Sequence, residues 1–177
     1  MADELTPVSP PESAPPDQLT SVLYGAAIVF VLAIVPYVSF INLLCCLGTV
    51  LGGFYTHFHY ATNFNLTLTA GDGFKLGALA GLVGGLAAVL VGFVLQLVFD
   101  YRAGEEAGRL IGEMMTGGNP AARAQMEQQM AQQKAEGLSV QNILIALGTT
   151  VIAYPIFGGI GGAIGASTIK KGPQTQV

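Results

Sequence analysis

The chain of 177 residues is 51% hydrophobic and only 10% charged, and its formal net charge is −4 at pH 7. Soluble domains carry about 25% charged residues, so this composition argues against a soluble globular domain. The acidic balance also argues against a nucleic-acid partner, because a phosphate backbone binds basic surfaces. Between Asp17 and Asp72 the chain has no Asp, Glu, Lys or Arg. We therefore expect an integral membrane protein that is surrounded by the lipid bilayer.

Residues 1–20 differ in composition from the chain that follows them. They contain five prolines and four acidic residues but no Lys or Arg, which predicts a disordered, Pro-rich acidic tail. No basic segment precedes the first apolar run. We therefore expect that run to be a retained membrane anchor rather than a cleaved secretory signal.

Four apolar segments predict an all-α membrane protein. Pro36 predicts the end of the first helix, and Pro155 predicts an interruption of the fourth. Between the second and third helices, the polar segment 61–72 predicts a loop whose last residue, Asp72, is the N-cap of the third helix. The four predicted transmembrane helices cover about residues 22–37, 43–60, 73–99 and 140–169.

The charge-rich segment 100–138 predicts an extramembrane insert, with helical patterns at 103–136. The four-helix transmembrane domain, including this insert, then covers residues 21–170, and residues 171–177 form a short polar tail. Four crossings put both termini on one side of the membrane. Lys75, Lys170 and Lys171 lie close to the membrane on that side, whereas Arg102, Arg109, Arg123 and Lys134 are spread over the insert on the other side. We expect the side with the termini to be cytoplasmic. A bacterial inner membrane is the expected location.

Glycines recur every four residues in the third and fourth predicted helices. Each glycine in a helix interior costs up to about 1 kcal/mol relative to alanine, so this spacing needs a compensating contact. A four-residue step keeps glycines near one face, where another backbone can approach closely. We expect these two helices to pack on each other, or one of them to face a partner chain. The predicted helix-packing residues are Gly73, Gly77, Gly81, Gly85, Gly158, Gly162 and Gly165.

Two pairs of methionines lie in the insert. Flexible, polarizable methionine side chains suit adaptable protein contacts, but they also suit the sealing of short helices against the headgroup region. Both interpretations stay open at this stage. The predicted partner surface consists of Met114, Met115, Met126 and Met130.

The apolar segments lack the residue patterns of an active site. His57 and His59 are two residues apart, so on a helix they point in different directions, and no carboxylate or thiol stands beside them. The chain has no phosphate-binding loop of the Walker type and no arrangement typical of a nucleophilic enzyme. We therefore predict no catalytic residues, no cofactor and no metal site.

The segments INLLCCLGTVLGGFY and GDGFKLGALAGLVGG carry a resemblance to small uncharacterised prokaryotic membrane proteins. The shared features are an N-x-L-C-C-L-G segment and glycine-zipper helices, and the resemblance covers roughly residues 22–169. It implies a multi-span helical fold without an assigned activity.

Two functions follow from these observations. The first is a non-enzymatic integral membrane protein that acts as a glycine-packed structural or accessory subunit of a homo-oligomer or a larger membrane complex. In this hypothesis the 100–138 segment recognises the partner. The alternative is a small oligomeric pore or transporter in which several copies surround a path with glycine-lined helices.

Overall fold

The computed structural model describes residues 16–35, 46–99, 109, 112–114, 117, 119–136 and 139–175. The prediction of a helical protein is confirmed. Two two-residue strands, which the sequence analysis did not predict, pair in parallel. The elements are α1 (Leu19–Ile34), α3 (Leu47–Phe64), β1 (Thr67–Leu68), α4 (Ala70–Phe99), α6 (Pro120–Glu136), α7 (Val140–Thr168) and β2 (Gln174–Thr175).

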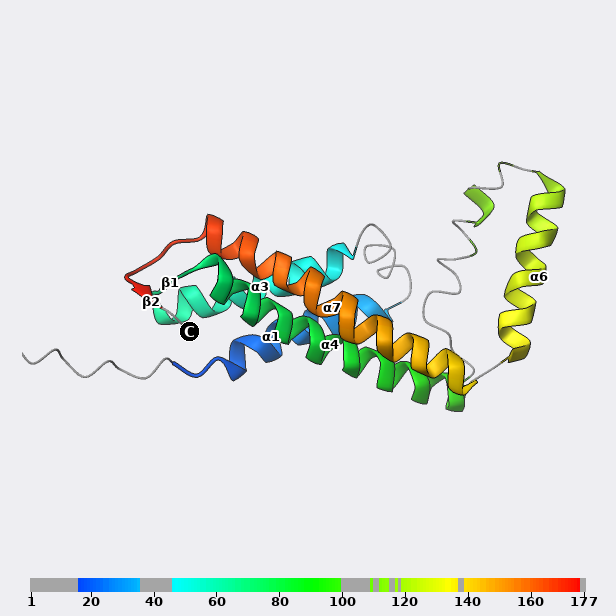
Figure 1. Cartoon of the computed structure of the whole chain (residues 1–177), viewed down its shortest axis with the longest axis horizontal. Helices are drawn as coiled ribbons and strands as arrows, with labels where there is room; N and C mark the ends of the chain where they lie inside the picture. The colour runs from blue at the N-terminus through cyan, green and yellow to red at the C-terminus, as the bar shows by residue number, and fades with distance from the viewer. Residues whose placement is uncertain are drawn as a thin grey trace, which may run out of the picture.

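Four helices form a bundle, and α6 stands apart from it (Figure 1). Within the bundle, α4 and α3 each contact both α1 and α7. The beginnings of α1 and α4 lie at the same end of the bundle as β1, β2 and the end of α7, whereas α6 lies beyond the opposite end (Figure 1). This end, where β1 and β2 pair, is called the strand end below.

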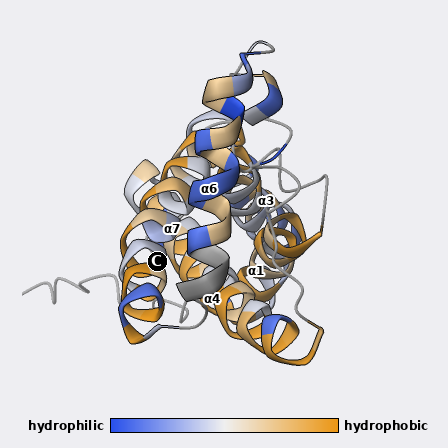
Figure 2. Cartoon of the chain, turned by 90° about the vertical axis from the view of Figure 1, so that its right-hand side faces the viewer, coloured by the Kyte–Doolittle hydropathy of each residue, from blue (hydrophilic) through white to orange (hydrophobic). Residues whose placement is uncertain are grey.

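Glycine and alanine make up much of the bundle interior, together with a few larger side chains such as Tyr60 and Leu76, and many large apolar side chains lie on its outside. The buried residues of α4 include Gly73, Gly77, Ala80 and Gly81, whereas Leu97 on the same helix is 70% exposed. The outer surface of the bundle is accordingly apolar, in contrast to the mixed surface of α6 (Figure 2). A soluble domain buries its large apolar residues instead. The distribution therefore suits an apolar surrounding.

Two described helices, α4 and α7, are long and apolar enough to cross a membrane. At about 1.5 Å per residue they span about 45 and 43 Å, against about 30 Å for a hydrocarbon core. Helix α1 is apolar but has only 16 residues. Helix α3 contains His57, His59 and Asn63 and does not meet the same criterion. Length and composition thus identify two of the four predicted spans.

The predicted first turn of the third helix is wrong by three residues. Helix α4 begins at Ala70, and Asp72 lies in its first turn instead of capping it. The Thr69 hydroxyl accepts from the Asp72 N–H at 3.2 Å and donates to the Asp72 carboxylate at 2.6 Å. Thr69 is therefore the cap, in a reciprocal arrangement that resembles a capping box. The Asp72 carboxylate also accepts from Lys75 Nζ at 2.9 Å.

Two further predicted boundaries change. Helix α3 continues to Phe64, so the predicted loop 61–72 shrinks to residues 65–69. Helix α7 is continuous through Pro155, so the predicted interruption is wrong. Helix α1 ends at Ile34, and Val35 is extended, as expected for a residue that precedes a proline.

The predicted polar tail 171–177 is partly folded. Thr67 pairs with Gln174, the Thr67 N–H donates to the Pro173 carbonyl at 3.0 Å, and the Thr67 hydroxyl donates to the Gly172 carbonyl at 2.7 Å. These bonds tie the segment after α7 to the loop before α4. Residues 1–15 of the predicted tail 1–20 lie outside the described residues, and its last two residues, Leu19 and Thr20, belong to α1 instead.

Thr69→Ala should lower the free energy of unfolding by about 1 kcal/mol, because the first turn of α4 loses the side-chain cap for the Asp72 N–H. Thermal unfolding of the purified protein in a mild detergent would measure this effect. The matched control is Thr168→Ala, since the Thr168 hydroxyl donates only to carbonyls of its own helix. Equal melting temperatures for the two variants would contradict the capping role of Thr69.

Candidate functional site

The backbones of α4 and α7 meet at glycines. A Cβ atom on Gly73 would lie 2.5 Å from the Gly162 carbonyl oxygen, and Cβ atoms on Gly77 and Gly81 would overlap the carbonyl oxygens of Gly158 and Tyr154. No real side chain tolerates such distances from a backbone. The close approach of the two helices therefore requires glycine at these positions of α4.

The requirement is reciprocal on α7. A Cβ atom on Gly158 would overlap the Gly77 carbonyl oxygen, and one on Gly162 would overlap that of Gly73. We call Gly73, Gly77, Gly81, Gly158 and Gly162 the α4–α7 glycine contact. It brings Cα atoms next to carbonyl oxygens of the facing helix, which permits dispersion and weak Cα–H···O contacts along the pair.

Gly85 and Gly165, also predicted as packing residues, have different neighbours. A Cβ atom on Gly85 would meet the Tyr154 ring at 2.6 Å, which is a side chain rather than the backbone of α7. A Cβ atom on Gly165 would lie 2.9 Å from His57 of α3. Gly165 thus belongs to a second glycine face of α7, which contacts α3 instead of α4.

The glycines through which α1 and α3 join the bundle were not among the predicted packing residues. Gly25 and Gly52 bring α1 and α3 together, Gly53 approaches the Gly158 backbone, and Gly84 approaches Ala26 and Val29 of α1. The signal was present, since Gly52 and Gly53 are adjacent and Gly84 directly precedes Gly85. Paired glycines mark two neighbouring faces of one helix, and each face can receive a different partner.

The two histidines of α3 lie in separate surroundings. His57 is fully buried; its Nε2 lies 3.4 Å from the Ile169 carbonyl oxygen, and its Nδ1 has no hydrogen-bond partner among the described residues. His59 faces α1 instead, where its Nδ1 lies 2.9 Å from the Ser21 hydroxyl. Across the described residues, no group of three or more His, Cys, Asp or Glu side chains could hold a metal ion.

The methionines of the predicted partner surface differ in exposure where the structure describes them. Met114 is 82% exposed. Met126 and Met130 on α6 are half-buried, and Met126 packs so closely on Gly112 that a Cβ atom there would overlap its sulfur. Met115 lies outside the described residues. Among the described methionines of the insert, Met114 is the most exposed, and Met126 contacts Gly112.

Fold and site together define a helical bundle built around two long apolar helices in close backbone contact. The family model described as "Protein of unknown function (DUF4199)" matches residues 19–171, so the chain belongs to this family. The match extends from the first residue of α1 past the end of α7 and includes the whole α4–α7 glycine contact. No curated protein and no solved structure matches the chain.

Gly77→Ala should lower the free energy of unfolding by about 1–3 kcal/mol, because its methyl group collides with the Gly158 backbone. The matched control is Gly92→Ala on the same helix, where a Cβ atom meets nothing within 4 Å. There the better helix propensity of alanine should raise stability, by up to about 1 kcal/mol. Thermal unfolding in detergent gives both values. The same change for both variants would contradict the packing role of Gly77.

Proposed function

We propose that this chain is a non-enzymatic integral membrane protein of four spans, a structural or accessory subunit of a homo-oligomer or a larger complex in a bacterial inner membrane. The observation that carries the proposal is the distribution of small residues inside the bundle and large apolar residues outside. Leu97, Phe99 and Val140 are each at least 70% exposed. In water, each Å² of such apolar surface costs about 25 cal/mol, whereas lipid removes this cost.

The shorter helices fit the same surroundings. Helices α1 and α3 span about 24 and 27 Å at about 1.5 Å per residue, slightly less than a hydrocarbon core. Both also expose apolar side chains outward, for example Leu23, Val31 and Leu51. The polar atoms of α3 are turned inward at His57 and toward α1 at His59. Four spans in contact with one another are therefore the favoured arrangement.

The charges favour an orientation. Lys75 lies in the first turns of α4, and Lys170 and Lys171 directly follow α7, so all three belong to the strand end. Basic residues close to membrane-spanning helices are enriched on the cytoplasmic side. We infer that the strand end faces the cytoplasm and that α6 lies on the other side.

The residues that surround the glycines of α4 and α7 favour a structural role over a pore. The α4–α7 glycine contact is occupied by the backbone of the facing helix, which leaves these glycines no path to line. The exposed Met114, beside the polar helix α6, is the surface that we assign to a partner. Contact through this region would attach the bundle to its complex without using the spans.

Single cysteines should report the topology. In a chain with Cys45 and Cys46 replaced by alanine, we expect Gln128→Cys on α6 to react with an impermeant maleimide in intact spheroplasts. Lys171→Cys should react only after permeabilisation. Labelling of both positions in intact spheroplasts would contradict four spans, and the reversed pattern would contradict the orientation alone. Recovery of the chain in the soluble fraction would contradict the membrane assignment.

The assembly role predicts that Met114→Lys shifts the protein to a smaller species, because a charged side chain replaces an apolar contact. Light scattering after size exclusion in a mild detergent measures the mass of the complex. Gln128→Lys, which adds the same charge at an exposed position of α6, is the matched control and should leave the mass unchanged. A monomeric wild-type chain that purifies alone would contradict the subunit role.

A further inference from the structure

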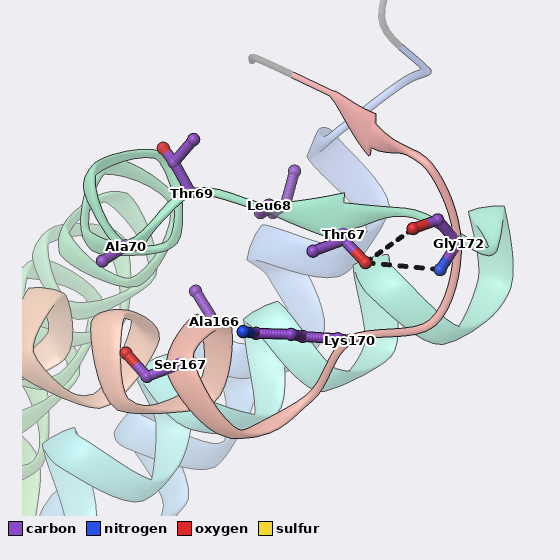
Figure 3. A pocket seen from close by; sticks show the side chains of 8 residues that line it. All are labelled: Thr67, Leu68, Thr69, Ala70, Ala166, Ser167, Lys170 and Gly172. Atoms are coloured by element: carbon purple, nitrogen blue, oxygen red, sulfur yellow. Dashed lines mark hydrogen bonds between the residues drawn. The ribbon is translucent and has the colours of Figure 1, made fainter.

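A pocket of about 500 Å³ opens at the strand end of the bundle. It lies where β1, the beginning of α4 and the end of α7 meet (Figure 3). Its size falls within the usual range of small-molecule sites, about 300–1,000 Å³. The lining residues are Thr67, Leu68, Thr69, Ala70, Ala166, Ser167, Lys170 and Gly172.

The charge of the pocket is positive. The Lys170 side chain points toward Ala166 across the pocket lining (Figure 3). Lys170 is the one charged residue in the lining, and the described residues supply no carboxylate within ion-pair distance of it. Asp72, the acid in the first turn of α4, is bound to Lys75 at 2.9 Å and to Thr69 at 2.6 Å.

Besides the Lys170 ammonium group, the beginning of α4 borders the pocket with backbone N–H groups. Ala70 lines the pocket, and the intrahelical bonds of α4 begin with the Gly73 N–H, which donates to the Thr69 carbonyl at 2.9 Å. The N–H group of Ala70 therefore comes before the first intrahelical hydrogen bond, at the N-terminal end of the helix, which carries partial positive charge. An ammonium group and the amide of a helix N-terminus suit a phosphate oxygen.

The wall of the pocket is held in place by hydrogen bonds. The Thr67 hydroxyl donates to the Gly172 carbonyl at 2.7 Å and accepts from the Gly172 N–H at 3.3 Å. The segment after Lys170 thus returns to β1, and a Cβ atom on Gly172 would overlap the Asn65 carbonyl oxygen. This fold-back fixes the backbone on both sides of Lys170, whose exposed side chain lines the pocket.

We propose that this pocket binds a phosphate group, with Lys170 as the cation that holds it. The strand end lies at an end of the two long apolar helices, and under the proposed membrane function this is the level of the lipid headgroups. An anionic phospholipid is then one source of the phosphate, and free phosphate in the aqueous phase is the other. The lipid source rests on the proposed function, whereas the phosphate chemistry does not.

The test uses the full chain in a neutral detergent and follows its thermal unfolding. We expect short-chain phosphatidylglycerol to raise the melting temperature more than phosphatidylcholine does. Inorganic phosphate, titrated separately, measures the free-anion source. Lys170→Gln should weaken the apparent affinity about tenfold or more, as expected for the loss of a charge-assisted hydrogen bond. Lys170→Arg should restore binding.

Lys171→Gln is the matched control, because it removes the same charge from a neighbouring exposed residue that does not line the pocket. It should leave the affinity unchanged. Ser167→Glu places a carboxylate in the pocket wall and should abolish binding even if Lys170→Gln is unstable. Equal losses for Lys170→Gln and Lys171→Gln would overturn the proposal, as would a wild-type chain that responds to neither probe. The titration with inorganic phosphate needs no membrane, so its result does not depend on the result of the topology experiment.

Discussion

The architecture depends on the approach of two backbones, those of α4 and α7. In a bilayer, apolar side chains gain little free energy by moving from lipid to a helix interface, so helices associate through packing and weak polar contacts. The five glycines of the α4–α7 glycine contact remove the side chains that would hold the helices apart, and the facing carbonyl oxygens fill the space. Each glycine weakens its own helix by up to about 1 kcal/mol, and the contact with the neighbouring backbone offsets that loss.

The other helices follow from the same constraint. Beside the α4–α7 pair, α1 packs against a second face of α4 at Gly84. Helix α3 packs against a second face of α7 at Gly161 and Gly165. Gly25 and Gly52 then close the contact between α1 and α3. Glycines thus lie at each of these helix contacts, larger side chains such as Val29, Tyr60 and Leu76 are buried between the helices, and many other leucine, valine and isoleucine side chains cover the outside. Toward the ends of α4 and α7 away from the strand end, a Cβ atom on Gly92 or Gly148 would meet nothing of a neighbouring helix within 4 Å.

Local sequence signals predicted the helices better than their ends. The four-residue spacing identified positions that do lie between α4 and α7, because glycine spacing reports helix geometry directly. Gly165 is three residues after Gly162 and therefore lies on a neighbouring face, where it packs against His57 of α3. At the start of α4, Thr69 and Asp72 are both good caps, and only the hydrogen bonds between them decide which residue ends the loop. Two of the four predicted spans meet the criterion of length and apolarity.

The strand end could not be predicted from the sequence, because it depends on residues about 105 positions apart. The segment after α7 is short and polar, and by composition it suits a free tail. Two features hold this segment in place. The Thr67 hydroxyl donates to the Gly172 carbonyl and accepts from the Gly172 N–H, and β1 pairs with β2. Neither feature has a local signature. The same fold-back gives the two ends of the bundle different chemistry: a tied, lysine-bearing surface at one end, and the polar helix α6 beyond the other (Figure 1).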